Sequence, residues 1–134
     1  LRKVSAKEKF KHLIQKPLEA IKSLMVSFNP DENTFTLSVQ DRELYMSNNL
    51  TQSLTEVFVT IGETALKTET GICFFIDEIQ YMKQNELGSL IAALHRTNQL
   101  GYPVMIIGAG LPKIYKMLSD EKSYGRKKFI FVFI

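Results

Sequence analysis

Apolar residues near the start of the chain recur at every third or fourth position. They lie between about Ser5 and Met25, at Phe10, Leu13, Ile14, Leu18, Ile21 and Leu24. This spacing predicts an amphipathic helix. Pro17 falls inside it and cannot donate a backbone hydrogen bond, so a kink or two shorter helices is expected.

A different periodicity follows. Val26–Phe28 and Thr34–Val39 are short runs separated by turn residues, and the second alternates polar and apolar side chains strictly. This pattern predicts a β-hairpin. After a polar stretch, helical spacing returns. Asn49 or Thr51 is expected to cap a helix that ends near Gly71. Its apolar stripe is Leu54, Val57, Phe58, Ile61 and Ala65.

Three later runs are continuously apolar: Ile72–Ile76, Val104–Ile107 and Phe129–Ile134. Such runs are typical of parallel strands covered by helices on both faces. A helix is predicted between the first two, from about Asn85 to Leu100, with Leu87, Leu90, Ile91 and Leu94 inward. Pro112 suits the first residue of a shorter helix at 113–118. Residues 120–128 are expected to be a charged loop. Right-handed crossovers then give an α/β fold with a parallel sheet.

Composition narrows the class of protein. The chain has 134 residues, 45% hydrophobic and 23% charged, with a net charge of +3, as expected for one soluble globular domain. Two loose basic clusters, at residues 7–16 and 113–128, include acids or apolar positions at helical spacing, so nucleic acid binding is not indicated. Cys73, the single cysteine, is expected to be a buried inert thiol. No secretory signal or membrane-length apolar stretch is visible, which predicts a cytoplasmic location without membrane association.

The first apolar strand ends on two adjacent acids, Asp77 and Glu78. Ligands of open parallel sheets bind beyond the carboxyl ends of the strands. Mg²⁺ prefers oxygen ligands and keeps several waters, so one carboxylate beside a phosphate suffices to orient it. A neighbouring carboxylate can polarise a water for attack on the phosphate. The pair is equally consistent with a cap on the following turn.

The wider sequence resembles a known family. "FIDEIQYM", "LIAALHRTNQLGYPV", "IIGAGLP" and "SYGRKKF" are together similar to a group of AAA+ P-loop ATPases of bacteria and archaea, related to the STAND-like signalling ATPases. The resemblance implies that Asp77 holds Mg²⁺ through water and that Glu78 activates the attacking water. It also implies that Gly108, Ala109 and Gly110 occupy the sensor region near ATP. The family usually has a polar side chain in this sensor region, whereas these three residues have none. The family carries an arginine in a later motif. That position falls on Lys127 in this chain, and Arg126 lies one place earlier. Lysine lacks the planar guanidinium group that contacts a phosphate through two hydrogen bonds, so the match at this motif is poor.

No G-x-x-x-x-G-K-[ST] phosphate loop occurs in the 134 residues. The expected fold is therefore an incomplete three-layer P-loop NTPase-like core without its P-loop strand. Residues 1–25 would be helical, 26–39 a hairpin insert, and 50–134 the part from Walker B to the last core strand. Both ends look cut from a longer ATPase, with the phosphate loop expected upstream. The chain alone is then expected to be inactive. It is also expected either to self-associate through free strand edges or to let Phe129–Ile134 move beside Val104–Ile107.

The alternative is a non-catalytic α/β interaction domain with a degenerate nucleotide site, since fold alone does not fix function. His95 and His12 are both expected to be structural. Neither has a partner at metal-ligand or catalytic spacing in the sequence.

Overall fold

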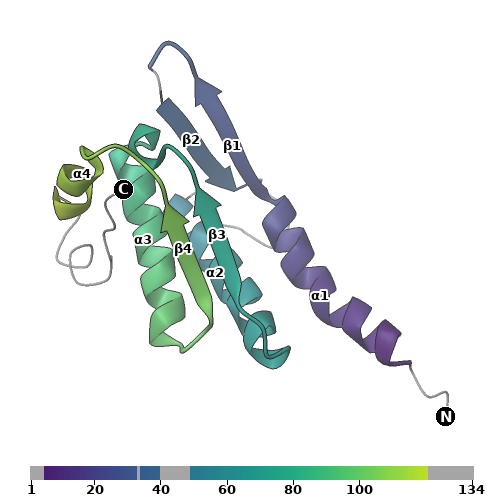
Figure 1. The fold of residues 1–134 in the computed structure, drawn as a ribbon. Helices are drawn as coiled ribbons and strands as arrows, with labels where there is room; N and C mark the ends of the chain where they lie inside the picture. Colours follow the sequence, from purple (N-terminus) through teal and green to yellow (C-terminus); the bar gives the residue numbers. More distant parts are fainter. Residues whose placement is uncertain (1–4, 33, 40–48, 121–134) are drawn as a thin grey trace.

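The computed structural model describes residues 5–32, 34–39 and 49–120 of the chain (Figure 1). The first half contains α1 (Ala6–Lys22), β1 (Leu24–Asn29), β2 (Thr34–Val39) and α2 (Leu50–Lys67). The second half contains β3 (Ile72–Ile76), the 3₁₀ turn η1 (Ile79–Tyr81), α3 (Gln84–Gln99), β4 (Val104–Gly108) and α4 (Ile114–Asp120).

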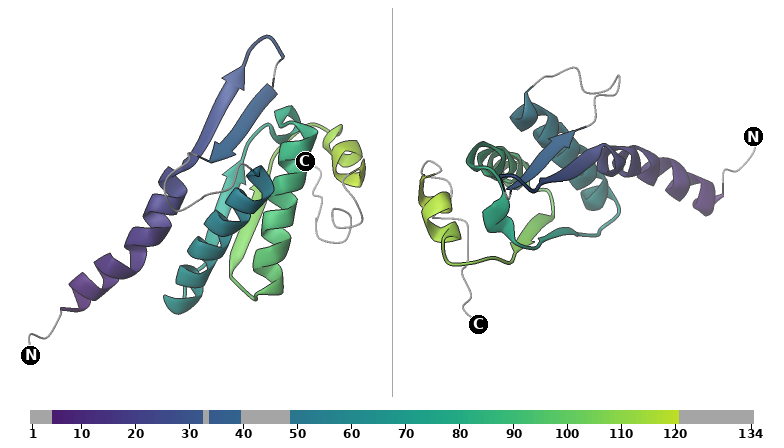
Figure 2. Two further views of the ribbon diagram at one scale, coloured as in Figure 1. Left: turned by 180° about the vertical axis from the view of Figure 1, so that it is seen from behind. Right: turned by 90° about the horizontal axis from the view of Figure 1, so that it is seen from above.

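Helix α1 is one helix that runs through Pro17, so the alternative of two shorter helices is wrong. Its start is fixed by a capping box in which Ser5 accepts from the backbone of Glu8 and the Glu8 side chain accepts from the backbone of Ser5. Pro17 and Ala20 are buried, and α1 packs on α2. This packing helps to offset the backbone hydrogen bond that Pro17 cannot make. The amino-terminal end of α1 projects away from the other elements (Figures 1 and 2).

Strands β1 and β2 form the predicted antiparallel hairpin, in which Val26 lies opposite Leu37. Two contacts hold the hairpin against the start of α3. The carboxylate of Glu86 accepts a hydrogen bond of 3.0 Å from the backbone N–H of Leu37. Lys83 Nζ lies 3.3 Å from Glu32 Oε2. Glu86 is only 4% exposed, so this buried carboxylate has the partner that burial requires.

Strands β3 and β4 are parallel and in register from Ile72 opposite Val104 to Ile76 opposite Gly108. Helices α2 and α3 pack against each other, and both lie on the same side of this strand pair (Figure 2, right). The core between them is built from apolar side chains of both helices and the inner face of the strands, including Leu54, Val57, Phe58, Ile61, Leu87, Leu90, Ile91 and Val104. The α/β class with a parallel strand pair and a hairpin is thus confirmed.

The prediction that β3 and β4 are covered on both faces is wrong for the described residues. Burial alternates along β3, and Phe75 is 77% exposed. Met105 and Ile107 of β4 are also exposed, and so is Cys73, contrary to the expected buried thiol. The reason is that α2 and α3 lie on one face and leave these four side chains on the other. The third predicted strand, Phe129–Ile134, lies outside the described residues, as does the predicted loop beyond Asp120.

The helix boundaries largely follow the sequence signals. Asn49 caps α2 by accepting from the backbone N–H of Thr51 at 2.9 Å. Gly101 takes a φ of +72° just after α3, a left-handed conformation that glycine adopts without steric cost. Helix α4 begins at Ile114, two residues after Pro112.

Candidate functional site

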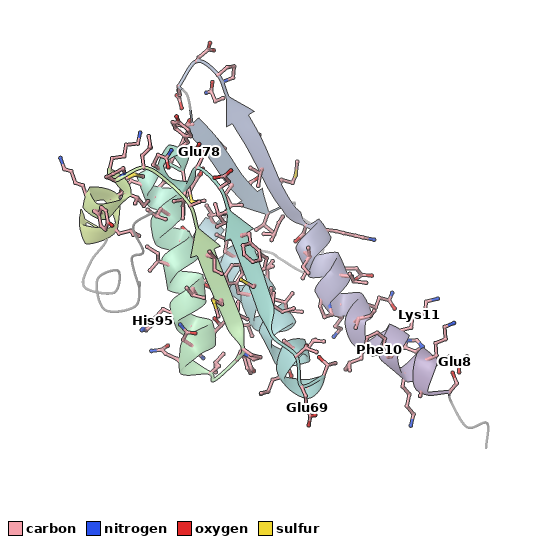
Figure 3. All side chains as sticks on the ribbon, viewed as in Figure 1. Glu8, Phe10, Lys11, Glu69, Glu78 and His95 are labelled. Carbon is pink, nitrogen blue, oxygen red and sulfur yellow. The ribbon has the colours of Figure 1, made fainter. Side chains whose placement is uncertain are left out.

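The carboxyl ends of β3 and β4 meet at one edge of the sheet because the strands are parallel and in register. Asp77 and Glu78 follow β3 directly. Gly108 is the last residue of β4, followed by Ala109 and Gly110. The structure therefore brings all five predicted site residues to the same edge. Figure 3 shows Glu78 at this edge, below the hairpin.

Backbone hydrogen bonds tie the two strand ends together beyond the ladder. Ala109 N–H donates to Ile76 O at 2.9 Å, and Ile79 N–H donates to Ala109 O at 3.0 Å. The Ala109 amide is thereby already used inside the fold. A Cβ added to Gly108 would lie 3.0 Å from Ile79 Cδ1, so glycine here allows close packing of η1 on β4.

Glu78 has a left-handed backbone, with φ 52° and ψ 39°. A non-glycine residue in this region carries a strain of about 1 kcal/mol or more. The Asp77 carboxylate supports the turn, because its Oδ1 accepts a 2.9 Å hydrogen bond from the Glu78 N–H. The chain thus turns sharply after β3, and both acids are exposed at the turn. Neither acid caps the 3₁₀ turn that follows, because Glu78 is its N-cap residue and makes no side-chain cap hydrogen bond.

Gln80 is the residue of this edge that sequence reasoning did not assign. It is 3% exposed and joins the two strand ends. Its Nε2 donates to Glu78 Oε2, and its Oε1 accepts from the backbone N–H of Leu111 at 3.0 Å. A Cβ on Gly110 would collide with that same Oε1. The two glycines in "GAGLP" gave a signal, since they mark close approach of another group to this backbone.

The two acids at this edge have no basic side chain paired with them in the described part of the chain. Within residues 5–32, 34–39 and 49–120, neither Asp77 nor Glu78 forms an ion pair. Two exposed carboxylates with this geometry can bind a cation, or they can accept hydrogen bonds from water or from another donor. In the same part of the chain, no three His, Cys, Asp or Glu side chains are grouped to hold a metal ion. One carboxylate plus water is the arrangement that Mg²⁺ commonly uses beside phosphates.

Other candidate residues lie apart from this edge. His95 sits on α3 well away from Glu78 (Figure 3), and His12 is on α1. Arg126 and Lys127 lie outside the described residues. Among the helices that are described, none is long and apolar enough to cross a membrane.

Comparisons with protein-family models, with curated proteins and with solved structures find no match to this chain.

Proposed function

We propose that the Asp77–Glu78 edge is the Mg²⁺-binding and water-activating part of an ATP site. In this proposal the chain is part of a P-loop ATPase of the AAA+ type that couples Mg-ATP hydrolysis to a conformational or partner-binding switch. The phosphate-binding loop would be supplied by residues outside these 134, since no Gly-Lys pair occurs within them.

The observation that carries the proposal is the position of the two acids. They lie at the carboxyl end of a parallel strand, exposed and without an ion pair in the described chain. This is the edge at which ligands of open α/β sheets bind. The neighbouring strand β4 ends at Gly108, opposite Ile76, so the carboxyl ends of both parallel strands lie beside the two acids.

The two carboxylates would have different roles. Asp77, with one oxygen on the Glu78 N–H, would orient Mg²⁺ through a bound water. Glu78 would polarise the attacking water, because its carboxylate is held by Gln80 and so keeps a fixed direction. Gln80 would act through Glu78 as a positioning residue.

The decisive experiment measures ATP hydrolysis by the longer protein that contains this chain. Glu78→Gln is expected to abolish hydrolysis, with a loss of at least about a hundredfold, while ATP binding persists. Asp77→Asn is expected to weaken Mg²⁺ binding and so to raise the Mg²⁺ concentration that hydrolysis requires. Glu69→Gln is a matched control, because Glu69 is an exposed glutamate with a similar φ of 54° that lies far from Glu78 (Figure 3).

Hydrolysis that survived in Glu78→Gln would exclude the water-activating role. For the 134-residue chain alone, calorimetry is expected to show only weak Mg-ATP binding and no turnover, since the amide cradle of the phosphate loop is missing. Micromolar Mg-ATP binding by this chain would contradict that expectation.

A second candidate function is supported by the open face of the sheet. Cys73, Phe75, Met105 and Ile107 are exposed side by side on β3 and β4, and contiguous exposed apolar side chains often mark interaction surfaces. A non-catalytic α/β interaction domain would use this face. An absence of ATP hydrolysis in the longer protein would favour this second function.

A further inference from the structure

A cavity of about 340 Å³ lies between the hairpin, β3 and the helices α2 and α3. The hairpin contributes Leu24, Val26 and Leu37 to its wall, and α2 contributes Leu54 and Phe58. Its size is at the lower end of the range of pockets that hold small organic molecules, about 300–1,000 Å³. The hairpin wall is fixed in place by the buried Glu86 and by Lys83, so the cavity is part of the folded architecture.

Charge is confined to one part of the cavity lining. Among the described residues that line it, Asp77 and Glu78 are the only polar ones, and all others are aliphatic, aromatic or methionine. Neither carboxylate forms an ion pair within the described chain. The cavity therefore combines an apolar wall with two negatively charged hydrogen-bond acceptors.

We propose that this cavity binds a small organic cation, in which an apolar body carries an ammonium or amidinium head. The body would fill the space between the hairpin and Phe58, which removes apolar surface from water. The head would donate hydrogen bonds to Asp77 and Glu78 in charge-assisted contacts. A neutral ligand would leave the two negative charges partly desolvated without a positive charge beside them, and an anion would be repelled.

A metal ion alone does not account for this cavity, because the apolar wall offers no oxygen ligands. The inference goes beyond the proposed ATP site and shares only Asp77 and Glu78 with it. It requires neither nucleotide nor a phosphate loop, so it can be tested on the 134-residue chain without ATP or Mg²⁺. Its outcome is then separate from that of the hydrolysis experiment on the longer protein.

The probes are phenylbutylammonium and its neutral counterpart phenylbutanol, which share an apolar body and differ in the charged head. Titration followed by NMR is expected to shift the backbone amides of the hairpin and of the β3 end. The ammonium is expected to bind about fivefold more tightly than the alcohol, because charge contacts with exposed carboxylates stabilise a complex only modestly. Asp77→Asn combined with Glu78→Gln is expected to remove that preference, so that the ammonium and the alcohol bind with similar affinity.

A pair of adjacent substitutions tests the location. Val26→Trp would place a large side chain in the cavity and is expected to weaken binding of both probes at least about tenfold. Val26 is 67% exposed, so the change is compatible with folding. Met25→Trp is the control, because Met25 is also exposed, does not line the cavity and points to the other hairpin face. Thermal unfolding of both variants verifies that they are folded.

Three results would overturn the proposal. The first is equal affinity of wild-type protein for the ammonium and the alcohol, which would exclude recognition of the charge. The second is unchanged binding in a folded Val26→Trp variant, which would place the ligand elsewhere. The third is no shift of any amide at millimolar phenylbutylammonium.

Discussion

Gln80 and Leu111 are joined by a hydrogen bond of 3.0 Å from the Leu111 backbone N–H to Gln80 Oε1, across 31 residues of sequence. The other end of the same amide group donates to Glu78. One buried side chain therefore connects the end of β3 to the segment after β4. Its amide sets the direction of the Glu78 carboxylate, on which the proposed chemistry depends.

Replacement of Gln80 by alanine is expected to destabilise the fold by about 1–3 kcal/mol. The change removes the donor to Glu78 and the acceptor for Leu111, and it leaves a void beside Gly110. Urea unfolding measures the effect. Gln99→Ala is the control, since Gln99 is exposed at the end of α3, and it is expected to change stability by less than about 0.5 kcal/mol. Equal stability of the two variants would contradict the bridging role of Gln80.

Removal of the buried Glu86 carboxylate should release the hairpin. Glu86→Ala leaves the Leu37 N–H without its acceptor, and a loss of about 1–3 kcal/mol is expected. Faster hydrogen exchange at the Leu37 amide is the specific readout. Glu86→Gln keeps an acceptor oxygen and should restore much of the protection. Glu63→Ala, which removes only an exposed pair with Lys67, should cost about 0–1 kcal/mol.

Gly62 is required for the contact between α2 and β4. A Cβ at this position would lie 2.8 Å from Tyr102 Cβ and 3.1 Å from Val104 Cγ2. Alanine favours a helix by about 1 kcal/mol over glycine, but the overlap is expected to cost about 1–3 kcal/mol. Gly62→Ala should therefore lower the melting temperature.

Gly71→Ala provides the matched control for Gly62. The nearest atom to a Cβ on Gly71 is Pro103 O at 3.8 Å, an ordinary contact distance. No comparable fall in melting temperature is expected for this variant. A similar loss in both would show that glycine flexibility, and not the contact with Tyr102, decides the result.

The exposed thiol of Cys73 gives a direct test of the one-sided sheet. Cys73 lies on the same face of β3 as Phe75. A thiol reagent such as dithionitrobenzoate is expected to modify native protein at a rate close to that of urea-unfolded protein. Strong protection in the native state would mean that another segment or a second copy covers this face.

Free strand edges are expected to promote self-association of the chain. In the described part of the chain, β3 pairs only with β4, so each strand has one edge with unpaired backbone groups, which can recruit another strand. Sedimentation velocity should show oligomers that grow with protein concentration. Met105→Lys combined with Ile107→Lys places charge beside the β4 edge and should reduce them.

Leu66→Lys is the control for this experiment, because Leu66 is 52% exposed on α2 and lies outside the sheet. It removes an exposed apolar side chain and adds the same charge, yet it should leave association unchanged. A monomer at all concentrations for the wild-type chain would refute edge pairing.

The local pattern of the sequence determined most of the elements. Alternation in residues 34–39 predicted the hairpin, and spacing of three and four predicted α2 and α3. Asn49 marked the start of α2 correctly, because a cap depends on neighbouring backbone groups. The same local logic placed Asp77 and Glu78 at the end of a strand.

Only the tertiary structure decided which faces of those elements are covered. A continuous apolar run such as Ile72–Ile76 is compatible with burial on one face or on two, and α2 and α3 both pack on one face, which leaves Phe75 exposed. The glycines of "GAGLP" indicated a close approach to this backbone, but they did not identify Gln80, because its partner Leu111 is brought near only by the parallel pairing of β3 and β4. Contacts between distant residues depend on how elements pack, and no local propensity encodes them.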